Sequence, residues 1–106
     1  MVIEQFAVYL VRLNPTVGSE ISKTRPCTVV SPEQLHRNLR TAIVAPMTTV
    51  LKGYPTRVRC DFAGKEGEIA LDQIRAVDQS RLVKRLGTLS PTQVAKVKRV
   101  LLEMFA

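Results

Sequence analysis

One segment, at the C-terminal end of the chain, has both the start signal and the apolar spacing of an amphipathic α-helix. This helix limits the folds that the rest of the chain can adopt. Residues 90–93 (SPTQ) have the pattern of a capping box with proline at the first helical position, which predicts the start of a helix. Beyond them, apolar residues recur at spacings of three and four, which is typical of one face of an amphipathic helix. These residues are Val94, Val97, Leu101, Met104 and Phe105. We expect Val97 and Leu101 to be buried against the body of the protein.

Strand-like runs make up most of the preceding sequence. Apolar or alternating runs bounded by turn residues predict strands at residues 8–13, 27–31, 41–45 and 57–62, and Gly64 and Gly67 are expected to bracket a hairpin into residues 68–71. Residues 15–25 are predicted to form an exposed loop, with Pro26 at the first position of the next strand. A second capping-box pattern, residues 31–34 (SPEQ), predicts a short helical turn through His36. At 106 residues we expect one domain, residues 1–106, with a mostly β fold closed by a C-terminal helix in a small, strongly bent sheet or barrel.

The charge of the chain indicates polyanionic partners. Sixteen Lys and Arg against nine Asp and Glu give a formal net charge of +7. Such a surface attracts nucleic acid, although it would attract an acidic protein equally and also serves solubility. No apolar run approaches the roughly 18 residues of a membrane-spanning helix. The apolar N-terminal stretch contains Glu4 and has no basic leader, so it reads as a first strand and not as a signal peptide. We therefore expect a cytoplasmic protein without a membrane partner.

Most familiar catalytic signatures are absent from the sequence. It has no GxSxG motif, P-loop, GxGxxG motif or zinc-ligand spacing, so neither a metal nor another cofactor is expected. His36 is the one histidine, which rules out an acid–base histidine pair within one chain, and we expect it to be an exposed structural residue. Cys27 and Cys60 lie in strand-like runs and are expected to be plain core or edge residues.

A polar loop and a polar strand end remain as candidate functional segments. In residues 18–26 (GSEISKTRP), glycine frees the backbone, Glu20 offers a carboxylate, and Lys23 and Arg25 offer charges suited to phosphate. The pair Thr48-Thr49 follows an apolar strand and could project from its rigid edge. On residue types alone, an ordinary solvated loop and a plain strand terminus remain the favoured interpretations.

Three sequence blocks, taken in order, resemble the signature of the MazF/PemK family of toxins. The first comprises residues 14–20 (NPTVGSE) and 23–26 (KTRP), and the second residues 44–49 (VAPMTT) with 53–55 (GYP). The third comprises residues 71–78 (LDQIRAVD) with Arg81-Leu82, followed by residues 87–89 (GTL). Because the blocks cover nearly the whole chain, the resemblance is highly specific.

This resemblance implies an SH3-like small barrel of the MazF/PemK/CcdB type that works as a symmetric homodimer. It implies a sequence-specific endoribonuclease, an mRNA interferase, that cuts single-stranded RNA without metal, using the 2′-OH to leave a 2′,3′-cyclic phosphate and a 5′-hydroxyl and so inhibiting translation and growth. By matching position, Arg25 takes the main catalytic role, Thr48 a supporting role, and Glu20 a place in the active-site loop as a candidate proton acceptor. It also implies a cognate acidic, MazE-like antitoxin whose partly disordered segment lies across the RNA groove.

The two loops around Glu20 and after Thr48 are expected to determine the RNA cleavage motif. We predict that RNA-binding residues come from these loops and from the polar positions beside them. The predicted RNA-binding residues are Asn14, Thr16, Ser19, Lys23, Thr49, Lys52 and Tyr54.

The chain departs from its relatives at two places. Many relatives carry Gly and then an acidic residue where this chain has Phe6-Ala7. The PemK-like branch has an Arg where this chain has Ala70, so we favour the branch that relies on Arg25 and Thr48 and expect Asp72 to be structural or peripheral.

Two other functions would fit parts of this sequence. A non-catalytic nucleic-acid-binding barrel would explain the charge, but only five aromatic residues are present and most are expected in the core. A gyrase poison of the CcdB type would need an available helix tip, whereas residues 101–106 are apolar and expected to be buried.

Overall fold

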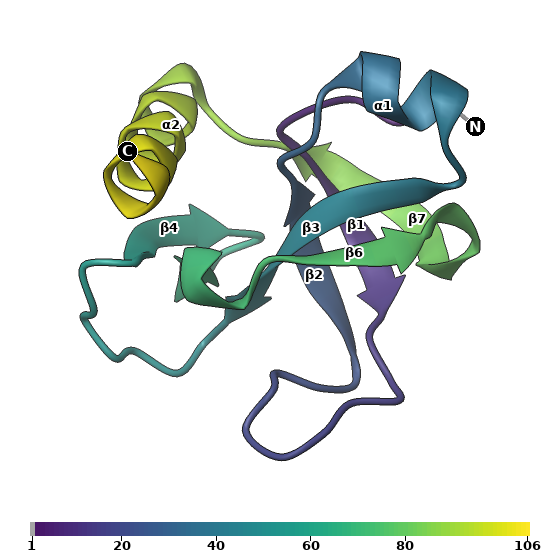
Figure 1. Ribbon diagram of the computed structural model, residues 1–106. Helices are drawn as coiled ribbons and strands as arrows, with labels where there is room; N and C mark the ends of the chain where they lie inside the picture. Colours follow the sequence, from purple (N-terminus) through teal and green to yellow (C-terminus); the bar gives the residue numbers. More distant parts are fainter. Residues whose placement is uncertain (1) are drawn as a thin grey trace.

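Seven antiparallel strands and two α-helices form the part of the chain that the computed structural model describes, residues 2–106. The strands are β1 (Ala7–Arg12), β2 (Thr24–Val29), β3 (Thr41–Thr48), β4 (Arg57–Phe62), β5 (Lys65–Ala70), β6 (Arg75–Asp78) and β7 (Leu82–Thr88), and the helices are α1 (Glu33–Asn38) and α2 (Pro91–Phe105). Single 3-10 turns, Leu71–Gln73 and Gln79–Arg81, flank β6. The predicted mostly β fold with a closing helix is confirmed (Figure 1). No helix within residues 2–106 is long and apolar enough to cross a membrane.

The sheet curls because β3 changes partner along its length. On one side β3 pairs with β2, while on the other its first half pairs with β6 and its last residues, Met47 and Thr48, pair with β5. The resulting strand order is β4-β5-β3-β2-β1-β7, with β6 beside β3. This curled half-barrel places the end of β3 where two loops, between β1 and β2 and between β3 and β4, leave the sheet (Figure 1).

Two apolar clusters fill the two faces of the curled sheet. Alternate residues of β1 serve both, because Val8 belongs to one cluster while Tyr9 and Val11 belong to the other. The first cluster lies beneath α2 and includes Ala45, Met47, Val58, Cys60, Ile69, Leu71, Leu89, Val97 and Val100. The second includes Leu13, Cys27, Val29, Val44, Val77 and Leu82. Cys27 and Cys60 are buried and unpaired, as expected of core residues.

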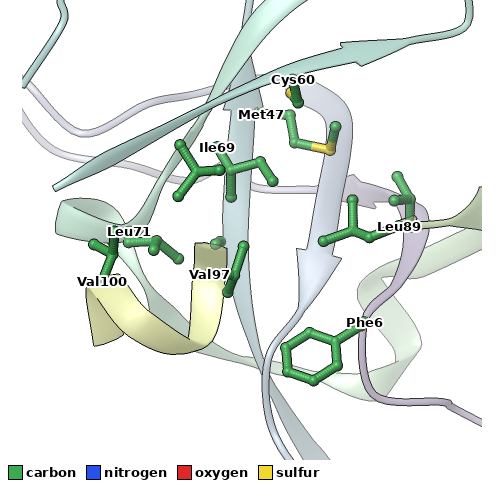
Figure 2. Packing of buried hydrophobic residues seen from close by; sticks show 11 residues of the cluster. Phe6, Met47, Cys60, Ile69, Leu71, Leu89, Val97 and Val100 are labelled. Atoms are coloured by element: carbon green, nitrogen blue, oxygen red, sulfur yellow. The ribbon is translucent and has the colours of Figure 1, made fainter. Parts of the chain in front are cut away.

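Helix α2 packs on the first cluster through Val94, Val97, Val100, Leu101 and Met104, with Val100 in place of the predicted Phe105. The capping box is present in full, with reciprocal hydrogen bonds between Ser90 and Gln93. Val97 is fully buried and, with Val100, points toward Leu71, while Leu101 is only partly buried against the cluster (Figure 2). Phe105 is 70% exposed, so its predicted place on the buried face is wrong. The apolar face therefore runs through Val100 to Met104, which is partly buried against the cluster, and leaves Phe105 outside it.

The second capping-box prediction is wrong, although a short helix does follow it. The N-cap of α1 is Pro32, and no side chain caps the helix. The Ser31 hydroxyl instead accepts a hydrogen bond from the Ile43 amide and bonds His36 Nε2 at 2.6 Å. His36 is half-buried and not exposed, because its Nδ1 also bonds the Ile3 carbonyl at 2.8 Å. It has a structural position, fixing the N-terminal segment to α1.

Several strand boundaries differ from those predicted. Strand β2 begins at Thr24, so Arg25 lies in a strand and not in a loop, and Pro26 is not at the strand's first position. The hairpin between β4 and β5 turns at Ala63 and Gly64, both with positive φ, whereas Gly67 lies inside β5. Strands β6 and β7 were not predicted, because their mixed polar sequences show neither clean alternation nor continuous apolarity.

Candidate active site

Arg25 and Thr48 come from neighbouring strands and meet at one cavity. The register of β2 and β3 pairs Cys27 with Pro46, and the same register continued by two residues sets position 25 opposite position 48. Both residues line a cavity of about 200 Å³ together with Thr49. Two residues that the sequence analysis linked only through family resemblance are therefore adjacent in the fold.

Arg25 is held by the chain in a way that leaves most of its guanidinium free. Its Nε donates a hydrogen bond to the Ser22 carbonyl at 2.8 Å, and the side chain is half-buried. Within residues 2–106 its two terminal nitrogens have no hydrogen-bond or ion-pair partner. A guanidinium fixed through Nε and open at its terminal fork is suited to a phosphate group.

The Thr48 hydroxyl can act as a hydrogen-bond donor. Thr48 is 9% exposed, and its Oγ1 accepts a hydrogen bond from the Val50 amide at 3.1 Å. Because the oxygen already accepts a backbone N–H, the hydroxyl proton remains available for an outside acceptor. Thr48 and Arg25 can thus both donate to one anionic group.

The cavity has an apolar floor that the sequence analysis did not assign to the site. Met47 and Cys60 are buried core residues that also line it, and they lie together at one end of the first cluster (Figure 2). Phe62, at the end of β4, forms another wall, and Lys65 and Glu66 at the start of β5 form the rim. The sequence analysis did not find the β4–β5 hairpin's part in the site, because only the curl of the sheet brings it to Arg25.

Glu20 lies outside this cavity. With Ser19 it lines a separate depression beside Asp72 and Gln73, and its Oε1 accepts a hydrogen bond from the Val17 amide at 2.5 Å. The structure therefore brings Arg25, Thr48 and Thr49 together and leaves Glu20 closing a turn of its own loop. A catalytic role for Glu20 remains a prediction.

The loop from β1 to β2 is tied down at both ends. Asn14 Oδ1 accepts from the Lys23 amide and the Thr16 hydroxyl, which closes the base of the loop. Near its middle, Gln73 Oε1 accepts a hydrogen bond from the Ile21 amide at 2.6 Å. Among the predicted RNA-binding residues, Asn14, Ser19 and Lys23 are exposed and Thr16 is half-buried, and Asn14 and Thr16 also hold the loop together.

A buried carboxylate holds the loop between β3 and β4, which carries Lys52 and Tyr54. Glu68, 2% exposed, faces Thr48 across the β3–β5 pair and accepts hydrogen bonds from the amides of Lys52 (3.0 Å) and Gly53 (2.8 Å). Arg57 pairs with Glu68, and its guanidinium carbon lies 5.2 Å from the centre of the exposed Tyr54 ring. The sequence analysis missed Glu68, since a carboxylate inside a short hairpin strand gives no local signal of burial.

Hydrogen bonds and the charge of Arg57 lower the pKa values of two carboxylates beneath this loop. Burial raises the pKa of Glu68, but the amides of Lys52 and Gly53 together with Arg57 outweigh it and leave the pKa below its ordinary value. Burial likewise opposes ionisation of Asp72, but hydrogen bonds from Arg57 and Thr56 lower its pKa overall. Asp72 is held by Arg57 and Thr56, and its expected structural or peripheral role stays a prediction.

No group of three or more His, Cys, Asp or Glu side chains within residues 2–106 is placed to hold a metal ion. The site of Arg25 and Thr48 instead offers hydrogen-bond donors and positive charge, a donor set for an anion. Burial raises the pKa of the Cys27 thiol to about 12, so this cysteine is not a nucleophile at neutral pH.

Comparison with known families decides what kind of protein carries this site. The profile of the PemK-like, MazF-like toxins of type II toxin–antitoxin systems matches residues 4–105. This chain belongs to that family. The expectation drawn from the three sequence blocks is confirmed at the level of the family.

Relatives of this toxin agree in sequence and fold. It is 33% identical over 107 residues to endoribonuclease EndoA of Bacillus subtilis, covering 95% of this chain and 92% of that protein. The crystal structure of MazF from Deinococcus radiodurans superposes with a TM-score of 0.86 at 25% identity, over 98% of this chain and 96% of that one. A MazE–MazF structure from the same organism matches with a TM-score of 0.79 at 25% identity, covering 100% and 99% of the two chains. The predicted barrel of the MazF type is therefore confirmed.

Proposed function

We propose that this toxin is a metal-independent endoribonuclease that cuts single-stranded RNA at specific sequences. In this reaction the ribose 2′-OH attacks the adjacent phosphate, the bond to the 5′-oxygen of the next nucleotide breaks, and the products carry a 2′,3′-cyclic phosphate and a 5′-hydroxyl. Cutting messenger RNA in the cytoplasm would stop translation and growth. The observation that carries the proposal is the shared cavity of Arg25 and Thr48, in a chain whose relatives include a protein named endoribonuclease EndoA.

The geometry supplies electrostatic stabilisation of the transition state. Attack by the 2′-OH places additional negative charge on the phosphoryl oxygens. The free terminal nitrogens of Arg25 and the free hydroxyl proton of Thr48 are available on neighbouring strands to stabilise that charge. Because these donors are already held by Ser22 and Val50, little reorganisation is needed during the reaction.

Glu20 is proposed as the acceptor of the 2′-OH proton. In the free protein its carboxylate is bonded to the Val17 amide and lies outside the Arg25 cavity. The proposal therefore requires the exposed turn around Gly18 to rearrange when RNA binds, which is consistent with its lack of buried side chains. Ser19, Lys23, Thr49, Lys52 and Tyr54 are exposed around the two loops and are proposed to contact the RNA.

We further propose that the toxin works as a homodimer and is neutralised by an acidic, MazE-like antitoxin. The MazE–MazF structure of Deinococcus radiodurans is a precedent for the antitoxin among its structural neighbours. A net charge of +7 gives an acidic segment a reason to bind across the same groove as RNA.

Cleavage of a long single-stranded RNA in EDTA tests the proposed function directly. We expect wild type to cut at selected sequences and to leave cyclic-phosphate ends, and Arg25→Ala to fold normally without cutting. Arg37→Ala, which removes an exposed charge on α1 instead, is the matched control and should cut like wild type. RNA binding without cleavage by wild type would favour a non-catalytic binding barrel, and Arg25→Ala with full activity would refute the catalytic assignment.

A further inference from the structure

We propose that the cavity beside Arg25 and Thr48 is a nucleobase subsite, walled by Phe62 and rimmed by Lys65 and Glu66. It would hold the base of a nucleotide whose phosphate rests on Arg25. The inference rests on the proposed function for the identity of the ligand as RNA, but it assigns a new part of the molecule, the β4–β5 hairpin, to RNA recognition.

The walls of the cavity are apolar although the cavity opens beside two phosphate-binding groups. Met47 and Cys60, 7% and 6% exposed, form its floor. Phe62 shares the inward face of β4 with Cys60, since both alternate with the exposed Arg59 and Asp61. A half-buried aromatic wall next to a phosphate site fits a base better than it fits sugar or phosphate, because every base presents a flat, stackable face.

The Phe62 ring packs against the opposite edge of the half-barrel. Its ring approaches β7, where a Cβ added at Gly87 would lie 3.4 Å from Phe62 Cε1. Strands β4 and β7 are the two ends of the strand order, so the Phe62 ring reaches across the open seam of the half-barrel. A side chain fixed in this way offers a pre-formed stacking surface.

The rim supplies polar groups for the edge of a base. Lys65 is paired with Phe62 across the β4–β5 hairpin and is exposed, and its ammonium has no ion-pair partner within residues 2–106. Glu66 is paired with Asp61 and bonded to Arg59 on the opposite face of the hairpin, so Lys65 is the polar side chain beside Phe62. A donor at the rim can favour bases that present an acceptor there, which apolar walls alone cannot do.

Binding of mononucleotides tests the subsite without relying on cleavage. We would measure the affinities of AMP, CMP, GMP and UMP, with ribose 5-phosphate as the probe that has the phosphate but no base. At least one nucleotide should bind wild type about tenfold more tightly than ribose 5-phosphate. Phe62→Leu and Lys65→Ala should each remove most of that difference in affinity. Phe62→Leu should also leave the affinity for ribose 5-phosphate unchanged. Lys84→Ala, which removes an exposed charge on β7, is the matched control and should keep the difference between nucleotide and ribose 5-phosphate.

Three outcomes would overturn the subsite. Two come from binding: equal binding of all four nucleotides and ribose 5-phosphate, or a base preference that survives both variants when their melting temperatures match wild type. The third comes from cleavage, which separates this failure from failure of the proposed function. If wild type cuts RNA and Phe62→Leu and Lys65→Ala cut the same sequences with the same KM, the enzyme stands and the subsite falls. If mononucleotides bind as expected and no RNA is cut, the subsite stands and the ribonuclease assignment falls.

Discussion

Gly67 lies against the backbone of Thr48, and a Cβ at position 67 would come 2.5 Å from the Thr48 carbonyl oxygen. The contact occurs where β5 pairs with the last two residues of β3, Met47 and Thr48. The position of the Thr48 hydroxyl therefore depends on the absence of a side chain on the neighbouring strand.

Gly67→Ala should consequently damage both the fold and the reaction. The clash is with backbone, which cannot move aside as a flexible side chain can, so we expect a loss of about 1–3 kcal/mol in the free energy of unfolding. We also expect a fall in kcat with little change in KM, because Thr48 shifts relative to Arg25. Gly87→Ala is the control, since its Cβ would meet only the Phe62 ring at 3.4 Å. Urea denaturation of both variants measures the stability difference. Equal free energies of unfolding for the two variants would contradict this argument.

Phe6 makes the departure from related sequences understandable. It adopts φ 66°, a conformation that favours glycine, where many relatives are expected to carry Gly. Its side chain is 9% exposed in the first cluster, near Leu89 and Val97, so burial of the ring offsets the backbone strain (Figure 2). β1 therefore keeps its position with Phe in place of Gly, because the buried ring compensates for the strained backbone.

Phe6→Gly should therefore be less damaging than Phe6→Ala. Both lose the buried ring, about 3–5 kcal/mol, but only glycine also relieves about 1–2 kcal/mol of left-handed strain. At Val8, a buried residue of β1, the usual order should hold and glycine should be the worse replacement. The free energies of unfolding of the four variants test this order. A Phe6→Gly variant less stable than Phe6→Ala would show that the backbone strain is not present.

Glu68 gives the stability of the protein a defined acid dependence. Its pKa is lower in the folded chain than its ordinary value of 4.5, so the folded state favours the ionised form. The stabilisation is present above about pH 4.5 and is lost as the pH falls through the folded pKa.

Glu68→Gln should be about 1–3 kcal/mol less stable than wild type at pH 7, because an amide group replaces one acceptor of the loop amides. The difference should narrow below about pH 4.5, as wild type takes up a proton there and the variant does not. Chemical denaturation between pH 3 and pH 7 measures it. A difference that is constant with pH would show that Glu68 is held equally well in its neutral form.

The sequence predicted the parts of this fold whose signal is local. Helix α2 was found because Ser90 and Gln93 cap it and its apolar period is long, and β4 was placed at its observed bounds because its alternation is regular. The capping pattern at Ser31 failed because tertiary partners, His36 and Ile43, compete for the same hydroxyl. Local pattern cannot show that competition.

The candidate site was likewise predictable only where the sequence itself carries the signal. Arg25 and Thr48 were located by family resemblance, and their adjacency follows from a β2–β3 register that residue types alone do not specify. Glu68 and Phe62 were missed, since each contributes only after the sheet curls and brings β5 or β4 beside β3. The expected burial of residues 101–106 was also wrong for Leu102 and Phe105, both 70% exposed, so the family match, and not a covered helix end, separates this toxin from a gyrase poison.

Glu20 allows the sharpest test of the proposed reaction, because its two possible roles respond differently to one substitution. As the acceptor of the Val17 amide it needs only an oxygen, which glutamine also supplies. As the acceptor of the 2′-OH proton it needs a carboxylate. We expect kcat for RNA cleavage to fall by about 10²–10⁴-fold in both Glu20→Gln and Glu20→Ala. If Glu20→Gln keeps the activity of wild type while Glu20→Ala loses activity, Glu20 holds the turn of its loop and another group takes the proton.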